Sequence, residues 1–516
     1  TPVGRAVRIK DSTTPTSQLV AFLDSQGNLY CQGYGFIGAD PDAFEAETTI
    51  TVGPPGYDYD CEYTDDEEPY DNEDPGSQAI QDAFTRAAVL GITYPVIVVY
   101  PRFENGVPVE TVYNPFNFNG VDAVVQSVAP EDPIVVRATV LQAAQAYSQP
   151  VVQFGGSETR RAALKGFTIR FGKPGIAGNG THAAVLNNIV QYNGYGTGYG
   201  GGLHNCDGLI QMNIIEWNQQ YYGGGLAYCD GTITNNIIRY NEATVAGGGL
   251  YGSTDPNPTP STDYPEIIAG NLIYCNRAAG WSGCGGALAD MGVPIQNNLI
   301  FYNSAYVNGG GLYQCTSHIE HNTVYHNVAA SGGGVHSCTG TGQVIRSNII
   351  WANTPNQILN STAPEFSCIQ GWSIYDQNGD GYDDLNGNTN QDPRFVTTAQ
   401  GSLFREFLHI SCTSACDSQA DASPCIDRGY KLGPKSAVAT LHRDHRDIDD
   451  QPTYVDITGI GSELFEDPDP DPTDDSVLPY DMGADEYPSP EEFAYWWELL
   501  GESVVTIYVP FCPGCN

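Results

Sequence analysis

A short acidic segment in the C-terminal part of the chain contains the residue types that bind calcium. Segment 376–384 places oxygen-bearing groups at alternate positions, as the loop of an EF-hand does, with a glycine at the sharp turn. The expected ligands are Asp376, Asn378, Asp380, the carbonyl of Tyr382 and Asp384. The last ligand position of the pattern holds a glycine rather than glutamate, so another carboxylate would have to complete the site. We predict a structural Ca²⁺ site, with a plain acidic turn as the alternative.

Groups that could support catalysis are less complete than this calcium pattern. Glycoside hydrolysis requires a pair of carboxyl groups. Two clusters could nominally supply such a pair: Asp383 with Asp384, and Asp447 with Asp449 and Asp450. Both lie in acidic turns, where solvated or calcium-bound carboxylates are expected. His442 and His445 could bind zinc, but no third ligand is evident. We therefore assign no catalytic residue and lean against an enzyme.

A repeated six-residue phrase must position the other candidate residues. It reads Asn, an apolar residue or Thr, Ile or Val, two variable residues, and Asn. Its first and last residues are Asn188 and Asn193, Asn213 and Asn218, Asn236 and Asn241, Asn271 and Asn276, Asn298 and Asn303, Asn322 and Asn327, and Asn348 and Asn353. Successive closing asparagines are 25, 23, 35, 27, 24 and 26 residues apart. This period predicts a solenoid with one phrase in each coil.

Each coil carries a second phrase, Gly-Gly-Leu or a close variant, as at Gly201, Gly224 and Gly248. Glycine there permits a positive φ or a close approach between coils. The other apolar runs, including 133–137, are too short for helices, so we interpret them as strands. Three short strands per coil predict an all-β, right-handed parallel β-helix solenoid with about 4.8 Å between coils. At the corners, asparagine tolerates the left-handed conformation and can hydrogen-bond to the amide of the next coil.

The fourth place of the repeated phrase changes character along the chain. If the third place points inward, alternation along a strand points the fourth place outward. The early copies have Gln191, Glu216 and Arg239 there, and the later copies have Tyr274, Phe301, Tyr325 and Trp351. Four stacked aromatic rings would form an apolar stripe about 15 Å long, which a soluble monomer seldom leaves bare. Either segment 493–500 packs over this stripe, or the stripe binds a glycan or another subunit.

Four cysteines recur at one place in the coil, three residues after the last residue of the Gly-Gly-Leu phrase. They are Cys206, Cys229, Cys315 and Cys338, with Ser253 and Met291 at the equivalent places of the two coils between. We interpret them as stacked inward core residues, although the expected coil spacing would also permit disulfides. The later cysteines look more like surface bridges: Cys412, Cys416, Cys425, Cys512 and Cys515.

The composition limits the partners and the location. With 61 acidic and 21 basic residues, the formal net charge of −40 at pH 7 argues against nucleic acids, anionic membranes and polyanionic substrates. No apolar run is long enough for a transmembrane segment, and no signal peptide is present in the chain as given. The acidic composition and the 14 cysteines favour a secreted, extracellular or bacterial cell-surface protein.

The sequence divides into five regions. These are an N-terminal segment (1–57), an acidic linker (58–77), the parallel β-helix (78–365), C-terminal coils and cap with the calcium-type loop (366–487), and a C-terminal tail (488–516). Apolar residues recur at helical spacing over 78–88, so we expect a helix that caps the first coils.

Several of these features resemble a known group of proteins. The entry segment 79–83, the coil at 164–170, the coil at 348–351 and the segments 391–395, 423–429 and 481–487 resemble secreted right-handed parallel β-helix repeat proteins of the pectate-lyase-like superfamily, notably bacterial surface forms. The Gly-Gly-Leu and closing-asparagine phrases are similar to repeats of chlamydial polymorphic outer-membrane proteins. The resemblance implies an architecture more than an activity, because the superfamily contains lyases, hydrolases, adhesins and structural proteins.

These observations favour a structural or adhesive protein over an enzyme. We expect a self-associating subunit of an extracellular filament or layer, because terminal segments such as 503–510 could add a strand to a neighbouring molecule. One alternative is a lyase or hydrolase that acts on a neutral polysaccharide. The other is a glycan-binding adhesin without catalytic activity.

Overall fold

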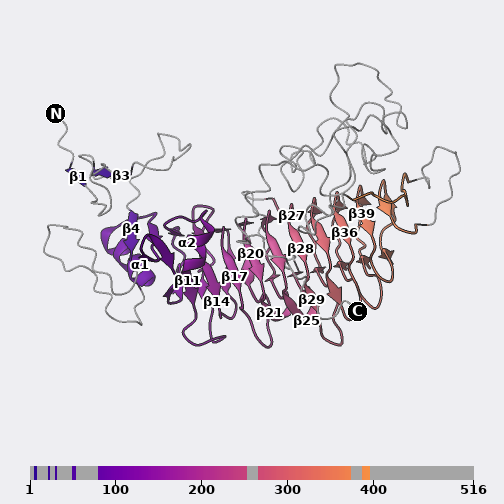
Figure 1. The fold of residues 1–516 in the computed structure, drawn as a ribbon, viewed down its shortest axis with the longest axis horizontal. Helices are drawn as coiled ribbons and strands as arrows, with labels where there is room; N and C mark the ends of the chain where they lie inside the picture. Colours follow the sequence, from indigo (N-terminus) through magenta and orange to yellow (C-terminus); the bar gives the residue numbers. More distant parts are fainter. Residues whose placement is uncertain are drawn as a thin grey trace, which may run out of the picture.

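The computed structural model describes residues 5–7, 21–23, 29–31, 49–53, 79–252, 265–372 and 386–395. Between residues 79 and 395, the described chain winds into a parallel β-helix whose coils stack along the long axis of the molecule (Figure 1). Three long sheets of 12, 11 and 10 strands run along this axis, and a shorter sheet of 4 strands lies at one corner. The predicted all-β parallel solenoid is confirmed.

The strands of the three long sheets are short and pair in parallel. The 12-stranded sheet contains, in spatial order, β4 (Thr49–Val52), β5 (Val96–Val99), β10 (Val124–Ser127), β13 (Ala163–Lys165), β16 (Ala184–Leu186), β19 (Leu209–Gln211), β23 (Thr232–Thr234), β27 (Ile267–Ala269), β31 (Ile295–Gln296), β35 (Ile319–Glu320), β38 (Ile345–Arg346) and β41 (Pro364–Glu365). The 11-stranded sheet contains β8 (Thr111–Tyr113), β11 (Thr139–Gln142), β14 (Thr168–Arg170), β17 (Ile189–Gln191), β20 (Ile214–Glu216), β24 (Ile237–Arg239), β28 (Leu272–Tyr274), β32 (Leu299–Phe301), β36 (Thr323–Tyr325), β39 (Ile349–Trp351) and β42 (Cys368–Ile369). The 10-stranded sheet contains β9 (Phe116–Asn117), β12 (Val152–Gln153), β15 (Ile176–Thr181), β18 (Leu203–Cys206), β22 (Leu226–Ala227), β26 (Leu250–Tyr251), β30 (Leu288–Ala289), β34 (Leu312–Tyr313), β37 (Val335–His336) and β40 (Ile358–Leu359).

Smaller sheets complete the described strands. The corner sheet contains β21 (Gln219–Tyr222), β25 (Glu242–Ala246), β29 (Arg277–Ala278) and β33 (Ser304–Ala305). The strands β6 (Arg102–Glu104) and β7 (Val107–Val109) form an antiparallel pair, and β1 (Arg5–Val7), β2 (Ala21–Leu23) and β3 (Leu29–Cys31) form an antiparallel sheet.

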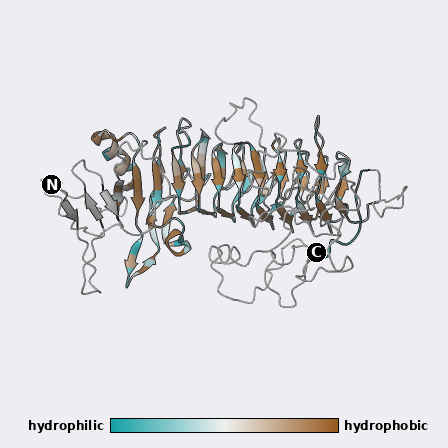
Figure 2. Cartoon of the chain, turned by 90° about the horizontal axis from the view of Figure 1, so that it is seen from above, coloured by the Kyte–Doolittle hydropathy of each residue, from teal (hydrophilic) through white to brown (hydrophobic). Residues whose placement is uncertain are grey.

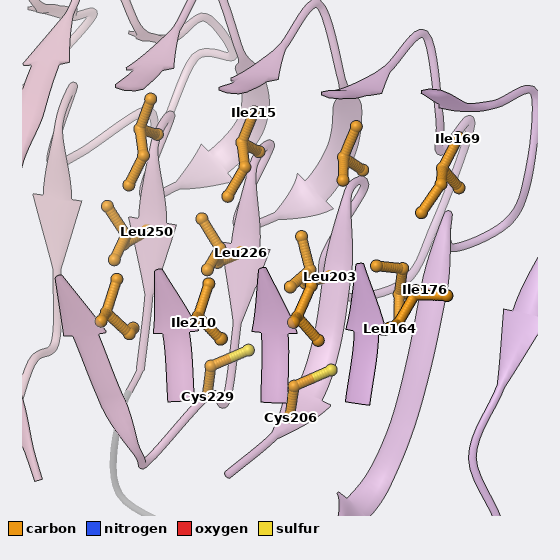
Figure 3. Packing of buried hydrophobic residues seen from close by; sticks show 14 of the residues in the cluster. Leu164, Ile169, Ile176, Leu203, Cys206, Ile210, Ile215, Leu226, Cys229 and Leu250 are labelled. Atoms are coloured by element: carbon orange, nitrogen blue, oxygen red, sulfur yellow. The ribbon is translucent and has the colours of Figure 1, made fainter. Parts of the chain in front are cut away.

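The core is built from one apolar residue per strand, repeated in every coil. The third place of the repeated phrase points inward, and its residues from Val190 to Ile350 are fully buried. The leucines of the Gly-Gly-Leu phrase form a second inward column, in which Leu203, Leu226 and Leu250 lie one above another (Figure 3). Hydrophobic residues therefore recur on successive strands along the helix (Figure 2). Each coil buries the same pattern against the next, which explains the long regular core.

Two ladders of asparagine side chains line the corners on either side of the 11-stranded sheet. Within the closing ladder, Asn303 donates from Nδ2 to the Oδ1 of Asn327 at 3.0 Å and to the carbonyl of Ile273 at 2.8 Å. Its own Oδ1 accepts from the backbone and the side-chain amide of Asn276 at 2.9 and 3.0 Å. Asn303 is fully buried, as are most members of both ladders. The predicted hydrogen bond from amide to amide is thus confirmed, and it runs through every copy.

The left-handed residue at each corner is not the ladder asparagine that the sequence analysis indicated. The positive φ belongs to the residue just before it, so at the closing corner Tyr192, Trp217 and Tyr240 have φ of 56°, 55° and 54°. The asparagine is thereby free to direct its amide into the corner, where the buried backbone groups need partners. The bend places the preceding side chain at the outside of the corner instead.

The Gly-Gly pair is explained by contact between coils. A Cβ on Gly224 would lie 2.5 Å from the carbonyl oxygen of Gly248 in the next coil, which is closer than a carbon atom can approach. The second place is less strict, because Ala287 occupies it in one coil. The positive φ expected in this phrase occurs one residue earlier, at Gly223 (61°) and its equivalents. Each turn therefore needs a run of glycines rather than a single one.

Two helices flank the first coils. The predicted capping helix is present as α1 (Ala79–Leu90), which packs Ile80, Ala83 and Phe84 into the core cluster. The interpretation of 133–137 as a strand was wrong, because these residues form α2 (Pro133–Ala138). The side chain of Asp132 caps this helix by accepting from the Ile134 amide, and proline occupies the first turn. A cap and a proline outweigh the strand preference of the two valines.

The stacked cysteines lie inside the helix as predicted. Cys206, Cys315 and Cys338 are fully buried, and Cys229 is 2% exposed. Met291 fills one intervening coil and is also buried, whereas the equivalent Ser253 lies outside the described residues. Each thiol donates to the carbonyl two residues earlier, and the cysteines described between residues 206 and 368 are free thiols. Cys206 and Cys229 are neighbours in one column (Figure 3). No described helix has the length and apolarity needed to span a membrane.

Replacing one ladder asparagine tests whether the ladders hold the corners. We expect Asn303→Ala to lower the free energy of unfolding by about 3 kcal/mol or more, because it removes several buried hydrogen bonds and leaves their partners unsatisfied. The exposed Gln149 provides a matched control, and Gln149→Ala should change stability by less than about 0.5 kcal/mol. Chemical denaturation of the full chain measures both values. Equal stability of the two variants would contradict a structural role for the ladder.

Candidate binding surface

The predicted metal and catalytic groups lie outside the described part of the chain. This applies to the calcium ligands Asp376, Asn378, Asp380, Tyr382 and Asp384, and to the carboxylate and histidine clusters between residues 383 and 450. Within the described residues, no three histidine, cysteine or carboxylate side chains are grouped to hold a metal ion. The outer surface of the β-helix is the candidate functional surface of the described part of the chain.

The fourth-place aromatic residues form one column, as their alternation predicts. The residues Tyr274, Phe301, Tyr325 and Trp351 are register partners on β28, β32, β36 and β39. The rings of Tyr274 and Phe301 are stacked, with centroids 4.9 Å apart. Three members are buried at 9% exposure or less, and only Trp351 is half-buried. The column is thus continuous but offers little free surface.

The second place of the phrase explains part of this burial. It points outward beside the fourth place, and Ile214, Ile237 and Leu299 there are no more than 2% exposed. These residues form a second apolar cluster outside the 11-stranded sheet together with the fourth-place rings. Val136 of α2 belongs to the cluster, and Phe395 packs against it with its ring 5.3 Å from that of Tyr325. From β28 to β36, this sheet is therefore apolar on both faces.

Apart from Phe103 on β6, the exposed aromatic residues that the structure describes lie elsewhere, at the corner between the 11-stranded and 10-stranded sheets. After residue 150, the large apolar side chains that the structure describes as exposed are Tyr192, Tyr195, Tyr199, Trp217, Tyr221, Trp281 and Tyr306. We call this set the aromatic edge. All its members are tyrosine or tryptophan, and they lie at a closing corner or between it and the following Gly-Gly-Leu phrase. Such a concentration of exposed aromatic surface along one edge is typical of a binding surface.

The corner sheet positions the centre of this edge. Its strands β21, β25 and β29 follow the lower edge of the helix in Figure 1. Tyr221 points outward from β21, Trp281 follows β29, and Tyr306 follows β33. Trp281 is 88% exposed, and its ring lies 5.6 Å from that of Tyr306 at an angle of 58°.

Small residues line the inner face of the corner sheet beneath these aromatic side chains. The inner faces of β25, β29 and β33 contribute Ala243, Ala278 and Ala305, which are 0%, 0% and 8% exposed. Their small size lets the corner sheet pack close to the wall, so the aromatic side chains stand on backbone that is hydrogen-bonded from coil to coil. The exposed rings therefore have a rigid support.

A column of polar side chains runs along the corner sheet. Gln219, Glu242, Arg277 and Ser304 are register partners on its four strands. Gln219 donates from Nε2 to Glu242 Oε1 at 3.2 Å, and Arg277 lies 3.9 Å from Glu242 Oε2. The Arg277 and Glu242 side chains remain 44% and 40% exposed. The column therefore presents both donors and acceptors to solvent.

The closing corners add a second row of rings at one end of the edge. Tyr192, Trp217 and Tyr240 hold the left-handed position of successive coils, and the Trp217 and Tyr240 rings stack with centroids 4.6 Å apart. Stacking covers the facing sides of these two rings, so mainly their edges and outer sides reach solvent. Beside them, Glu216 accepts from Arg239 Nε at 2.7 Å.

This arrangement is suited to binding. Both glutamates beside the aromatic edge, Glu216 and Glu242, are paired with arginines. Each carboxylate therefore helps to hold a charged arginine side chain in place beside the exposed rings. Exposed rings beside fixed donors and acceptors can instead hold an amphipathic partner by stacking and hydrogen bonding.

Sequence reasoning identified the fourth place of the phrase and missed the fifth. The fifth place carries Tyr192, Trp217 and Tyr240, and an aromatic residue before a corner asparagine was a visible signal in the repeat. The fifth-place side chain lies at the outside of the corner because the backbone there is left-handed. The simple alternation of inward and outward side chains along a strand does not describe such a bend. Trp281 and Tyr306 lie in segments of variable length, so their common edge appears only once the coils are stacked.

Comparison of the chain with protein-family models, with curated proteins and with solved structures gives no match in any of the three. The fold and the surface geometry therefore carry the functional inference.

A histidine at the border of the aromatic edge predicts a pH effect on stability. His204 lies outward on β18 with its ring 6.1 Å from that of Tyr199, and burial lowers its pKa. Folding thus favours the neutral imidazole, so this stabilisation is present above the ordinary pKa of about 6.5 and is lost as pH falls through the lower folded value. Between about pH 7.5 and 5, the melting temperature of the native protein should fall by about 1–3 °C more than that of His204→Phe. Parallel melting curves would contradict this.

Proposed function

We propose that the protein is an extracellular structural or adhesive scaffold, a rigid β-helical rod that attaches to another macromolecule through its aromatic edge. The observation that carries this proposal is that the exposed tyrosine and tryptophan residues within the described part of the chain are confined to that one edge. Exposed rings of this kind oppose solubility unless they serve an interaction, because their apolar surface is better buried. Membership of the secreted pectate-lyase-like superfamily and a bacterial cell-surface location belong to the same proposal.

The long ladders support a mechanical role for the rod. The closing ladder runs without interruption from Asn193 to Asn353, where Gln357 Oε1 accepts from the last backbone amide at 3.0 Å. Because each coil is hydrogen-bonded to its neighbours along the whole length, a partner bound at one coil is held by the entire helix. Such a scaffold holds a partner firmly without needing any catalytic group.

Self-association into a filament or layer is the second candidate, and one strand favours it. β4 is the terminal strand of the 12-stranded sheet, and among the described strands it pairs only with β5. Thr49 and Thr51 of this strand are exposed. A free strand edge can accept a strand from a second molecule. Helix α1 covers the adjacent end of the core, so contact through the core itself is disfavoured there.

A binding experiment on the full chain tests the aromatic edge. Retention is measured on particles of insoluble neutral polysaccharide, on protein-coated beads and on beads that carry the chain itself. We expect the native protein to be retained on at least one surface, and Trp217→Ser/Trp281→Ser to bind about tenfold more weakly, because two exposed rings are lost.

Val89→Ser is the matched control for this experiment, because it removes an 81% exposed apolar side chain on α1, away from the edge. It should bind as the native protein does, and melting curves should show that all variants are folded. Equal retention of the native protein and the double variant on every surface would contradict the proposal. If the double variant is still retained on beads that carry the chain, self-association does not depend on the aromatic edge, and β4 is the candidate for it.

We also propose that Ca²⁺ binds the acidic loop through Asp376, Asn378, Asp380, Tyr382 and Asp384 and stabilises the C-terminal coils. Ligand that binds only the folded state raises stability by about 2.7 kcal/mol at a concentration of 100 times Kd. Excess Ca²⁺ should therefore raise the melting temperature above that in chelator.

Two charge-removing variants test the calcium proposal. Asp380→Asn should abolish the Ca²⁺-dependent rise in melting temperature, whereas Asp449→Asn, an equal loss of charge in another acidic turn, should retain it. A rise of the same size in both variants would show nonspecific screening rather than a site.

A further inference from the structure

We propose that the partner of the aromatic edge is a neutral, extended polysaccharide that lies along the corner sheet. This inference rests on the proposed function of the edge and names its ligand class. The site would consist of Tyr221, Trp281 and Tyr306 as stacking residues, with Gln219, Glu242 and Arg277 as hydrogen-bonding residues.

The residue types at the edge favour a sugar over an apolar protein surface. Its exposed apolar members are tyrosine and tryptophan without any leucine, isoleucine, valine or phenylalanine. A sugar ring has a face of C–H groups that packs on the negatively polarised face of an aromatic ring, while its hydroxyl groups remain free for hydrogen bonds. Trp281 is 88% exposed and offers such a face, and Tyr306 is inclined towards it at 58°.

The polar column supplies the hydrogen-bonding partners that a sugar requires. Arg277 offers donors, the Glu242 carboxyl group offers acceptors, and the Gln219 amide offers both. The three side chains are already held to one another by the contacts of Gln219 and Arg277 with Glu242. Sugar hydroxyls both donate and accept, so they can bind this column without leaving a charge unpaired.

The direction of the edge favours a chain of sugars rather than a single one. Tyr221 and Tyr306 lie three coils apart, because β21, β25, β29 and β33 are successive strands of one sheet. At the parallel-strand spacing of about 4.8 Å per coil, this separation is about 14 Å. Of the two coils between them, the coil of β25 carries the exposed Thr244 and the coil of β29 carries Trp281. An extended polysaccharide can therefore contact aromatic residues at both ends of this stretch.

The net charge of the chain favours a neutral glycan over an anionic polysaccharide or a second copy of the chain as the ligand. The chain carries a net charge of −40, so an anionic polysaccharide would be repelled. A second copy of the chain would bring the same charge and the same repulsion. A neutral glycan has no such cost, and the charges that it meets on the corner sheet are the paired Glu242 and Arg277.

Affinity electrophoresis tests the ligand class with the full chain. Native gels contain hydroxyethyl cellulose or galactomannan as neutral polysaccharides, or polygalacturonate as an anionic one. We expect at least one neutral polymer to retard the native protein and polygalacturonate to have no effect. Trp281→Ser and Tyr306→Ser should each weaken the interaction by about tenfold, because each removes one stacking ring. Tyr306→Phe, which keeps the ring, should restore most of the binding.

The controls separate failure of this inference from failure of the proposed function. Val89→Ser should be retarded as strongly as the native protein, and melting curves identify any variant that is unfolded. Stronger retardation by polygalacturonate than by the neutral polymers would overturn the inference. The inference would also be overturned if neither neutral polymer retarded the native protein while the aromatic edge was still required for retention on protein-coated beads or on beads that carry the chain. The proposed function would stand in that case. If no surface shows dependence on the edge, both fail.

Discussion

The hydrogen bond from one asparagine amide to the next is the interaction on which the rest of the structure depends. At each corner of the 11-stranded sheet, the chain turns inside the protein, and its backbone groups are removed from water without a strand partner. The ladder amides satisfy them: Asn213, for example, donates to the carbonyls of Val185 and Gln211 and to Asn236 Oδ1. Because each amide also accepts from the coil before it, every corner is placed in register with the next.

Keeping the corners in register has consequences for the surface. Once successive corners superimpose, equivalent side chains form columns, whether the columns are inside the helix or outside it. The buried leucines, the stacked thiols, the fourth-place rings and the polar column of the corner sheet all arise in this way. The ladder therefore creates the aligned surface that a long partner can follow, although no ladder side chain is exposed enough to touch it.

The aromatic edge illustrates how variation is accommodated in such a regular frame. The closing corner fixes where each outward segment begins, and the Gly-Gly-Leu phrase fixes where it must return. Between these points the chain is free to differ in length, as it does around Trp281, without disturbing the core. The outward segments can vary in sequence and function because the ladders and the inward columns stabilise the fold without them.

The repeats alone predict the period, the parallel solenoid, the ladder partners and the inward third place, because each depends only on the repetition of the same residue types at the same interval. They also align Tyr274, Phe301, Tyr325 and Trp351 correctly. The tertiary structure decided which aromatic residues are exposed, since an outward residue such as Phe301 becomes buried when other apolar groups pack beside it. It also decided the helix at 133–138, where a local cap outweighs strand preference, and the exposure of Trp217, which follows from a left-handed bend. Burial at an outward position is a property of neighbours that lie far away in the sequence, so no local pattern could supply it.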